Sequence, residues 1–306
     1  MQVSDYSNIY QLGSRNARNL FDGGPLVVQE KVDGSQFSFA NVGDTLHCRS
    51  KNNAVDQNTG GMFARAFETA EIIFNAGKLP EGWVARGEVL SKPKHNVLKY
   101  ERTPVGGIIL YDIEGPQRSG VYHAPGALKN QAEEWGLEVV PTFAYEAFES
   151  IDTLRGYLSG WLARTSILGG VTVEGVVVKN YRLRDQEDNV LMAKYVSEAF
   201  KEKAIPGHNA KPEGTIVQQI LAECGKEAIW QKAVQHLRDA GALQQDPKDI
   251  GALVKEIKGD FTKEHGDEIK SRLAEAYYGE VMAGILNGFP QWYKAKLAEV
   301  PTNEAL

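Results

Sequence analysis

The stretch VVQEKVDGSQFSFA, residues 27–40, decides how the first half of the chain is interpreted. Two valines before its centre and two phenylalanines after it are typical of strands. Asp33-Gly34 between them is a hairpin turn signal, because both residue types tolerate the positive φ of such turns. The stretch therefore predicts a β-hairpin. A hairpin does not require Lys31, which is either a solvated strand end or a nucleophile.

The composition is that of an ordinary globular protein, since 42% of the 306 residues are hydrophobic and 24% are charged. The length predicts two domains. No run approaches the ~18 apolar residues of a membrane helix, and no signal-peptide pattern opens the chain, so we expect a cytoplasmic protein. Cys48 and Cys224 are the only cysteines, and neither a disulfide framework nor a thiolate metal site is expected.

The net charge of −6 at pH 7 argues against a protein that coats nucleic acid nonspecifically, because phosphate contacts need clustered lysine and arginine. A local basic groove is compatible with this charge. No G-x-x-x-x-G-K-[ST] loop occurs, so a P-loop enzyme is not expected. The six histidines show no pairing at metal-ligand spacing, which argues against a zinc site.

Residues 1–200 show more strand patterns than helix patterns. The expected strands are Phe37–Ala40, Thr45–Arg49, Trp83–Leu90, Gly107–Ile113, Val139–Phe143, Gly175–Lys179 and Val190–Val196. Helical periodicity is present in residues 62–74 and 153–163. Because strands and helices do not alternate regularly, the pattern predicts an α+β fold rather than a doubly wound sheet.

The composition changes near residue 201. Residues 201–214 are rich in lysine, proline and glycine, which predicts a linker. Residues 215–306 show no strand pattern and predict a helical domain of four or five helices. One predicted helix, residues 266–286, carries an apolar residue at every fourth position from Ile269 to Ile285, which indicates a single apolar stripe.

Several charged residues lie in or beside apolar strands. Lys31 precedes Asp33-Gly34, Glu174 and Lys179 flank a buried strand, and Lys194 lies between apolar neighbours, where burial is costly unless the amine meets an anion. Each feature alone is compatible with a solvated strand end or a structural role. Further strand positions of this kind are Arg49, Lys51, Glu88, Tyr111 and Asp112. Together they predict a groove lined by lysine, arginine and glutamate between two sheets.

These motifs resemble those of the covalent nucleotidyltransferases, the superfamily of ATP-dependent polynucleotide ligases and mRNA capping enzymes. EKVDG, EGVVVK and AKYVSEAFKE carry the resemblance, which is closest to RNA ligases of the phage RNA ligase 2 type. The shared features are an E-K-x-x-G-[ST]-x-F context, a G-E-x element, an aromatic-Asp-Ile element and a K-x-x-x-x-x-F-x-E ending. The resemblance implies an adenylyltransferase domain with ATP-grasp-like antiparallel sheets, followed by a helical domain, and it fits a phage-encoded protein.

The resemblance also implies a role for each matching residue. Lys31 would form the lysyl-AMP bond, and Glu174 would bind or organise the divalent metal. Lys179 and Lys194 would hold the α-phosphate and orient pyrophosphate. The nucleotide contacts would come from Glu30, Val32, Gln36, Arg49, Glu88 and Tyr111. Arg49 would contact the ribose or the phosphate, and Glu88 would contact the ribose hydroxyls. Tyr111 would stack on the adenine, and the backbone of Glu30 would meet the edge of the base. Val196 departs from the family, which usually has a second lysine there.

The residues themselves are suited to this chemistry. A lysine attacks phosphorus only as the free amine, and its ordinary pKa is about 10.4. Neighbouring cations such as Lys179, Lys194 and a metal ion would lower that pKa and neutralise charge on the phosphoryl group. Carboxylate ligands and a phosphate substrate favour Mg²⁺, with Mn²⁺ as the alternative.

The sequence thus predicts an ATP-dependent RNA ligase that joins 3′-OH and 5′-phosphate RNA ends, in a nicked duplex or in single strands, and acts as a monomer. Two alternatives stay open. One is a DNA ligase or mRNA guanylyltransferase of the same superfamily, which commonly carries an OB-fold where residues 215–306 predict helices. The other is a non-catalytic RNA- or nucleotide-binding protein, which the valine at position 196 would suit.

Overall fold

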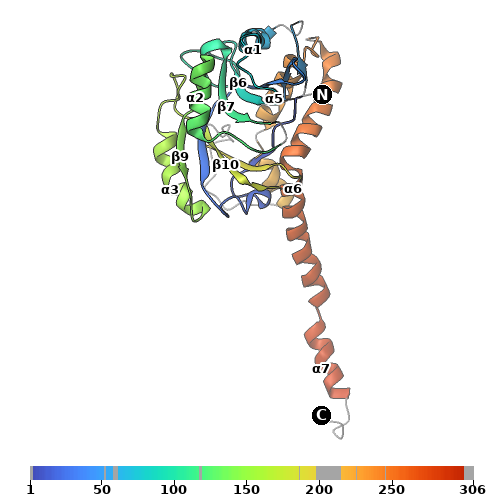
Figure 1. Cartoon of the computed structure of the whole chain (residues 1–306). Coiled ribbons are helices and arrows are strands. Elements are labelled where there is room, and N and C mark those ends of the chain that lie inside the picture. Colours follow the sequence, from blue (N-terminus) through green and yellow to red (C-terminus); the bar gives the residue numbers. More distant parts are fainter. Residues whose placement is uncertain are drawn as a thin grey trace.

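The protein is described by a computed structural model that covers residues 3–51, 53–57, 61–116, 119–185, 187–197, 215–224, 226–244 and 246–299. Two β-sheets and the helices on their outer faces form the part before residue 198, and helices alone follow from residue 215 (Figure 1). The predicted α+β class and the predicted helical C-terminal region are both confirmed. The predicted linker 201–214 lies outside the described residues.

The first sheet, sheet A, contains the strand that ends in Lys31. Its order is β1-β11-β10-β2-β9. The strands are β1 Ile9–Gln11, β11 Val190–Val196, β10 Gly175–Arg184, β2 Leu26–Lys31 and β9 Thr142–Glu146. β1 and β11 are parallel, whereas the other neighbours in this sheet are antiparallel.

The second sheet, sheet B, begins immediately after the Asp33-Gly34 loop. Its order is β5-β4-β3-β6-β7-β8. The strands are β5 Ala54–Val55, β4 Leu46–Ser50, β3 Ser35–Asn41, β6 Val84–Val89, β7 Ile108–Glu114 and β8 Glu138–Val139. Only β7 and β8 are parallel among these pairs.

The predicted hairpin at Asp33-Gly34 is wrong, because β2 belongs to sheet A and β3 to sheet B. β2 pairs with β9 and β10 instead, and β3 pairs with β4 and β6. Gly34 is still needed at this crossing, since a Cβ there would lie 2.9 Å from the Val89 carbonyl oxygen and 3.0 Å from Glu88 Cβ. The Lys31 loop therefore connects the two sheets rather than two neighbours of one sheet.

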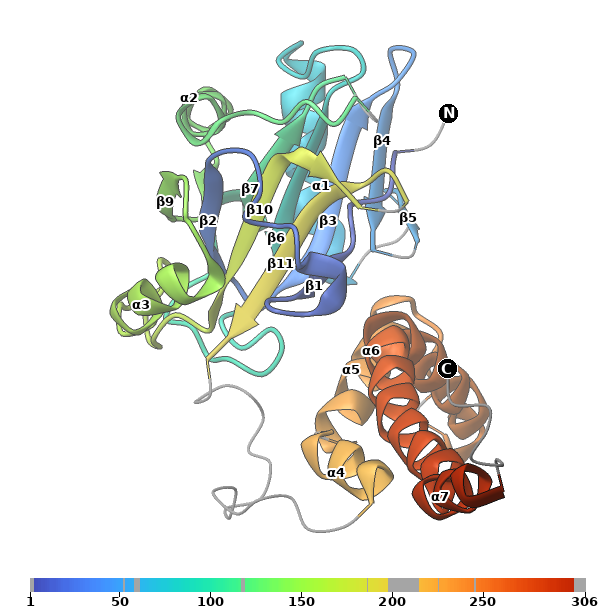
Figure 2. The same cartoon turned by 90° about the horizontal axis from the view of Figure 1, so that it is seen from below.

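Helices cover the outer face of each sheet. Sheet B packs against α1 Ala64–Asn75 and α2 Pro125–Trp135 through a core that includes Phe37, Phe39 and Leu110. Sheet A packs against α3 Ile151–Leu162 through Val28, Val176 and other apolar side chains. Ser150 caps α3 by accepting a hydrogen bond from the Thr153 amide, whereas α2 ends at Gly136 with the left-handed φ of +71° that glycine tolerates. The inner faces of the two sheets are thus left to face each other (Figure 2).

The alternation of side chains along the strands identifies the residues on these inner faces. In sheet A, Lys31 lies opposite Gly175, Gln29 opposite Val177, and Val177 opposite Lys194. In sheet B, Gln36 lies opposite Glu88, and Ser38 lies between Arg49 and Arg86. We call the space between these two faces the groove. Its polar lining contrasts with the apolar outer faces that pack on the helices.

The helical region differs from the prediction in its boundaries. Its helices are α4 Ile216–Glu223, α5 Lys226–Asp239, α6 Ile250–Leu286 and α7 Phe289–Glu299. The predicted helix 266–286 is the C-terminal part of a longer helix, α6, which begins at Ile250. Thr215 and Gln218 form a capping box that starts α4. Four 3₁₀ turns lie elsewhere in the described ranges, at Arg15–Ala17, Gly61–Phe63, Val105–Gly107 and Pro247–Asp249.

Candidate functional site

The centre of the groove is an ion pair between Lys31 and Glu174. The Lys31 amine donates to both carboxylate oxygens of Glu174, each at 2.8 Å, and the Lys31 side chain is 26% exposed. Glu174 precedes β10, and this position at the strand end allows it to reach the lysine across from Gly175. A Cβ at position 175 would lie 2.2 Å from the Tyr195 carbonyl oxygen, so only glycine fits there.

The electrostatics of Lys31 are set by two opposing effects. Burial lowers the pKa of the amine, but the Glu174 carboxylate, with smaller contributions from Asp33 and Glu88, outweighs burial and raises the pKa above its ordinary value. Lys31 is therefore an ammonium at neutral pH in the ligand-free protein. To act as a nucleophile it must lose a proton, which requires that Glu174 be drawn away or neutralised.

The loop after Lys31 is held by a network centred on Asp33. Its carboxylate accepts hydrogen bonds from the Val97 and Leu98 amides, both at 2.9 Å, and from Asn96 Nδ2 at 3.2 Å. The Asp33 amide donates to the Tyr100 hydroxyl at 2.8 Å. Asp33 thus fixes the lysine-bearing loop to residues 96–100. The sequence marked Asp33 only as a turn residue and gave no signal for this partner segment.

Two polar side chains in the groove have buried atoms without a described partner. Glu88 Oε2 and both amide atoms of Gln29 find no hydrogen-bond partner among the residues that the structure describes, and Gln29 is only 1% exposed. Burial raises the pKa of Glu88 to about 8, and the charge of Lys31 only partly offsets this. Such groups are costly in a folded protein unless a ligand satisfies them. Sequence reasoning missed Gln29, which is read as one more strand residue.

Lys179 and Tyr111 lie together but away from Lys31. The Lys179 amine is 2.9 Å from Asp112 Oδ2, 3.1 Å from the Tyr111 carbonyl oxygen and 5.0 Å from the centre of the Tyr111 ring. Asp112 also accepts hydrogen bonds from the Tyr6 and Tyr181 hydroxyls. Burial lowers the pKa of Lys179, and Asp112 partly offsets the effect. Lys179 is thus paired with a buried carboxylate, four residues along β10 from Gly175.

Lys194 faces the groove from β11. Residues that lie opposite one another on neighbouring strands form a row across the sheet, and of the rows that face the groove, that of Lys194 is next to that of Lys31. It lies opposite Val177 of β10 and beside Gln11 of β1, and it is partly buried. Val196 lies opposite Gly175, in the same row as Lys31. The position on β11 that shares the row of Lys31 therefore carries an apolar side chain.

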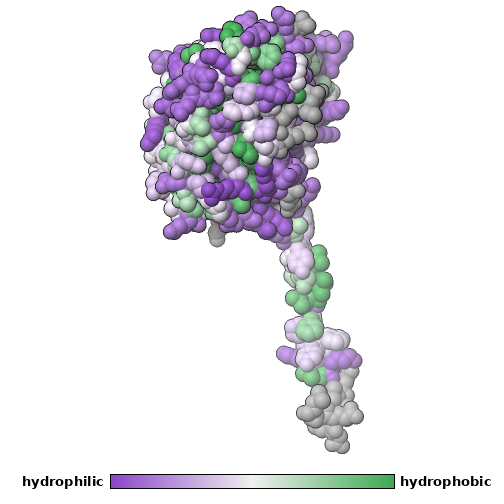
Figure 3. Space-filling model, in the orientation of Figure 1, coloured by the Kyte–Doolittle hydropathy of each residue, from purple (hydrophilic) through white to green (hydrophobic). Residues whose placement is uncertain are grey.

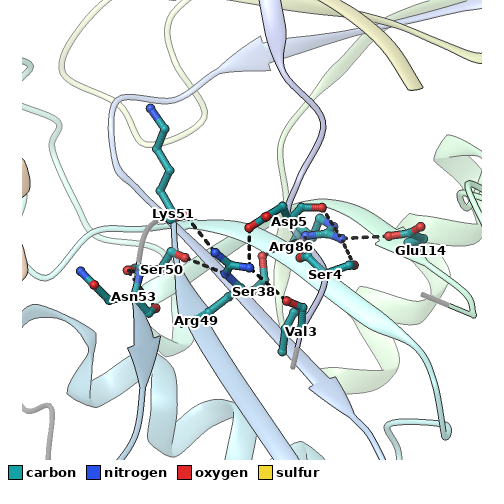
Figure 4. Close-up of polar contacts among 10 residues, drawn as sticks. All are labelled: Val3, Ser4, Asp5, Ser38, Arg49, Ser50, Lys51, Asn53, Arg86 and Glu114. Carbon is teal, nitrogen blue, oxygen red and sulfur yellow. Dashed lines mark hydrogen bonds and ion pairs between the residues drawn. The ribbon is translucent and has the colours of Figure 1, made fainter. Parts of the chain in front are cut away.

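Arg49 lies at the groove, but its guanidinium contacts the N-terminal segment. It pairs with Asp5 at 2.5 Å and donates to the Val3 carbonyl oxygen at 3.0 Å, with further bonds to the carbonyls of Ser50 and Lys51 (Figure 4). The neighbouring Arg86 is fully buried. It binds Glu114 at 2.9 Å and also Ser4, whose segment it holds against sheet B (Figure 4).

The remaining predicted residues occupy different positions around Lys31. The Glu30 carboxylate points to the outer side of sheet A, where it binds Ser166 and the Ile167 amide, and the Glu30 amide donates to Pro141. Burial raises the pKa of Glu30 despite these bonds. Val32 is buried in an apolar cluster with Leu90. Gln36 lies in the groove opposite Glu88.

A sequence model of the RNA ligase family matches residues 24–196, which include both sheets and the groove except for β1. This match covers more than half of the chain. The chain belongs to the RNA ligase family.

Solved structures provide a weaker comparison. A Naegleria gruberi RNA ligase with PPi is 15% identical over 65% of this chain and 58% of that chain, with a TM-score of 0.48. A point mutant of the same Naegleria gruberi enzyme with ATP and Mn is also 15% identical, over 65% of this chain and 57% of that one, with a TM-score of 0.47. The chain thus spans less than two thirds of these relatives. Among curated proteins, no significant match is found.

In this family member the helical region contacts the mouth of the groove. Asp239 of α5 accepts a hydrogen bond from the Ser35 hydroxyl at 3.3 Å, directly beside the Lys31 loop. Asp260 of α6 binds Lys51 at 3.4 Å and Lys232 at 2.6 Å. The contacts of Asp239 with Ser35 and of Asp260 with Lys51 join the two parts of the chain, and nothing in the sequence pattern indicated them. No helix in the described ranges has the length and apolar character needed to cross a membrane.

Proposed function

We propose that the protein is an ATP-dependent RNA ligase that acts through a covalent lysyl-AMP intermediate on Lys31. The observation that carries the proposal is the position of Lys31 in a groove lined by unsatisfied polar groups, within a chain of the RNA ligase family. The N–P bond forms between Lys31 and the α-phosphate of ATP as the bond to pyrophosphate breaks. AMP then passes to the 5′-phosphate of RNA, and attack by a 3′-OH joins the ends and releases AMP.

The nucleotide would supply the partners that the groove lacks. We propose that Glu88 accepts hydrogen bonds from the ribose hydroxyls through its unpaired oxygen, and that the buried amide of Gln29 meets the polar edge of the base. Tyr111 would stack on the base, with Gln36, Val32 and the Glu30 backbone nearby. Arg49 would contact the phosphates after it exchanges Asp5 for the ligand. Lys194 would face the phosphates from sheet A.

A divalent metal ion fits the carboxylates of this site. No group of three or more His, Cys, Asp or Glu side chains that could hold a metal is found within the described residues. Mg²⁺ commonly takes only one or two protein carboxylates together with phosphate oxygens. Glu174 would be that carboxylate, and the metal would supply charge neutralisation at the phosphate. When Glu174 binds a cation, its hold on the Lys31 proton weakens, which favours the free amine.

The polynucleotide specificity is tested by sealing assays. We expect ATP-dependent joining of a labelled 5′-phosphate RNA strand to a 3′-OH RNA strand, on a nicked duplex or on single strands. Lys31→Ala should abolish joining, while Lys78→Ala, a change on the loop after α1, should not. Joining of all-DNA nicks in preference to RNA would instead indicate a DNA ligase. Transfer from GTP would indicate a guanylyltransferase.

The second candidate is a nucleotide-binding protein without turnover, which Val196 favours because the row of Lys31 lacks the usual lysine. Binding of ATP without any covalent adduct or joining, by folded protein, would support this candidate.

A further inference from the structure

The end of α6 and most of α7 expose a series of apolar side chains. From Tyr277 to Leu297 every residue except Met282 is exposed. We call these residues, the end of α6 and most of α7, the stalk. α7 continues in the direction of α6, away from the two sheets (Figure 1). The stalk is about 30 Å long, since a helix rises about 1.5 Å per residue and only Asn287 and Gly288 interrupt the helical backbone.

The exposed side chains of the stalk are unusually apolar. Nine large apolar residues on it are at least half exposed, and Tyr278 and Ile285 reach 69% and 67%. Hydrophobic side chains gather along the stalk in Figure 3, in contrast to the polar body above it. Single exposed apolar residues are normal on a protein surface, but a contiguous apolar face indicates an interaction site.

In place of the monomer expected from the sequence, we propose that the stalk is a dimerisation element whose partner is the stalk of a second copy of this chain, paired antiparallel. The apolar residues recur at every fourth position at the end of α6 and again in α7, on either side of a break at Asn287 and Gly288. An antiparallel two-fold pairing about Ile285 therefore sets α6 of one copy beside α7 of the other, with Val281 level with Phe289 along the stalk and Tyr277 level with Tyr293. A two-fold interface needs such self-complementarity, because each residue meets its own counterpart in reverse order.

The charges support the antiparallel direction. The base of the stalk and the turn before it carry Glu275 and Glu280, and its tip carries Lys294 and Lys296. Antiparallel pairing brings the lysines of one copy beside the glutamates of the other, whereas parallel pairing sets like charges together. Residues 275–297, the stalk and the two residues before it, contain two acidic and two basic residues, so this segment lacks the large basic excess by which a helix attracts RNA or anionic lipid.

The area is sufficient for a specific dimer. A half-exposed aromatic or large aliphatic side chain offers about 100 Å², so nine of them offer about 900 Å² per copy. If pairing covers two thirds of that area, the dimer buries about 1,200 Å² in total, which is the lower limit of specific interfaces. The stalk lies outside the groove, and this inference does not depend on the proposed function.

The test is the mass of the full chain in solution. At protein concentrations of about 1–100 μM, at which a dimer with an interface of this size should form, analytical ultracentrifugation should give twice the mass of the chain. Ile285→Asp should return the mass to that of one chain. Ala283→Asp, which places the same charge in the same helix on the opposite face, should leave the dimer intact and controls for helix propensity.

A cysteine at the two-fold axis provides a second measurement. Ile285→Cys should form a covalent dimer with a short bis-maleimide, because each copy presents the residue to its counterpart, and Ala283→Cys should not. The unmodified chain, with a buried Cys48 and a partly buried Cys224, gives the background. A single-chain mass at all concentrations, with no cross-link at position 285, overturns the proposal. A mass change only with added RNA, or flotation of single chains with vesicles, would overturn it in favour of those partners.

Discussion

Replacement of Glu88 by glutamine should stabilise the ligand-free protein at alkaline pH, although the side chain lies at the centre of the proposed site. One carboxylate oxygen of Glu88 has no described partner, and burial raises the pKa to about 8. An unfolded glutamate ionises near its ordinary pKa of 4.5. Ionisation of Glu88 in the folded protein therefore costs free energy that glutamine does not incur.

The sign and size follow from linkage. Below about pH 4 the carboxyl is protonated in both states and costs nothing. Between about pH 4.5 and 8 the unfolded chain releases the proton first, so the stability of the wild type falls as pH rises. A difference of about 3.5 pKa units corresponds to about 5 kcal/mol, and water in the groove reduces this to about 2–4 kcal/mol.

Urea unfolding of the two proteins across pH provides the assay. At about pH 9 the free energy of unfolding of Glu88→Gln should exceed that of the wild type by about 2–4 kcal/mol, and the difference should shrink toward zero near pH 4. Glu133→Gln, on an exposed face of α2, serves as the matched control and should show no such trend. A Glu88→Gln variant that is less stable at pH 9, or a difference that does not depend on pH, would refute the reasoning.

Three further predictions concern the ion pairs and the loop around the groove. Lys179→Met leaves the buried Asp112 carboxylate without its ammonium partner and should lower the free energy of unfolding in urea by about 3–5 kcal/mol. The double variant Lys179→Met with Asp112→Asn should recover part of this loss. A single variant as stable as the wild type would contradict a structural role for the ion pair. Burial alone would raise the pKa of Asp260, but the pairing with Lys232 outweighs it and lowers the pKa to about 2. The ion pair therefore contributes about 1–2 kcal/mol to the free energy of unfolding, fully above about pH 4, and this contribution is lost as pH falls through 2. Asp260→Asn should lower the free energy of unfolding by that amount at pH 7, and the difference between the two proteins should shrink as pH falls from 4 and vanish below about pH 2. Asp33→Asn should speed hydrogen exchange at the two backbone amides that its carboxylate binds, and unchanged protection there would contradict the loop network.

The strand residues were predictable because their patterns are local. Residues 36–40 alternate between polar and apolar side chains because one face of the strand packs on a core, and residues 108–113 and 176–178 are mainly apolar. All three segments were predicted as strands, and the two sheets confirm these predictions. The hairpin prediction failed because Asp33-Gly34 is equally suited to a loop that crosses between sheets. Whether β2 and β3 pair depends on β9, β10 and β6, which are distant in sequence.

The site was predictable in its residue types and only partly in its contacts. Lys31 and Glu174 are separated by 143 residues, and only the pairing of β2 with β10 brings them together. Local spacing cannot reveal that Lys179 is paired with Asp112, or that Arg49 is engaged by Asp5. The roles predicted for these residues at a bound nucleotide stay predictions, because they require the ligand to replace those partners.

The central claim is that Lys31 forms a covalent bond with AMP. The most direct test is incubation of the full chain with Mg²⁺ and α-labelled ATP, followed by peptide mapping by mass spectrometry under alkaline conditions, which preserve a phosphoramidate. The account predicts one AMP adduct on the peptide that contains Lys31, and none in Lys31→Arg protein that retains the wild-type unfolding free energy. Folded wild-type protein that binds ATP but carries no adduct, or an adduct on another lysine, would contradict it.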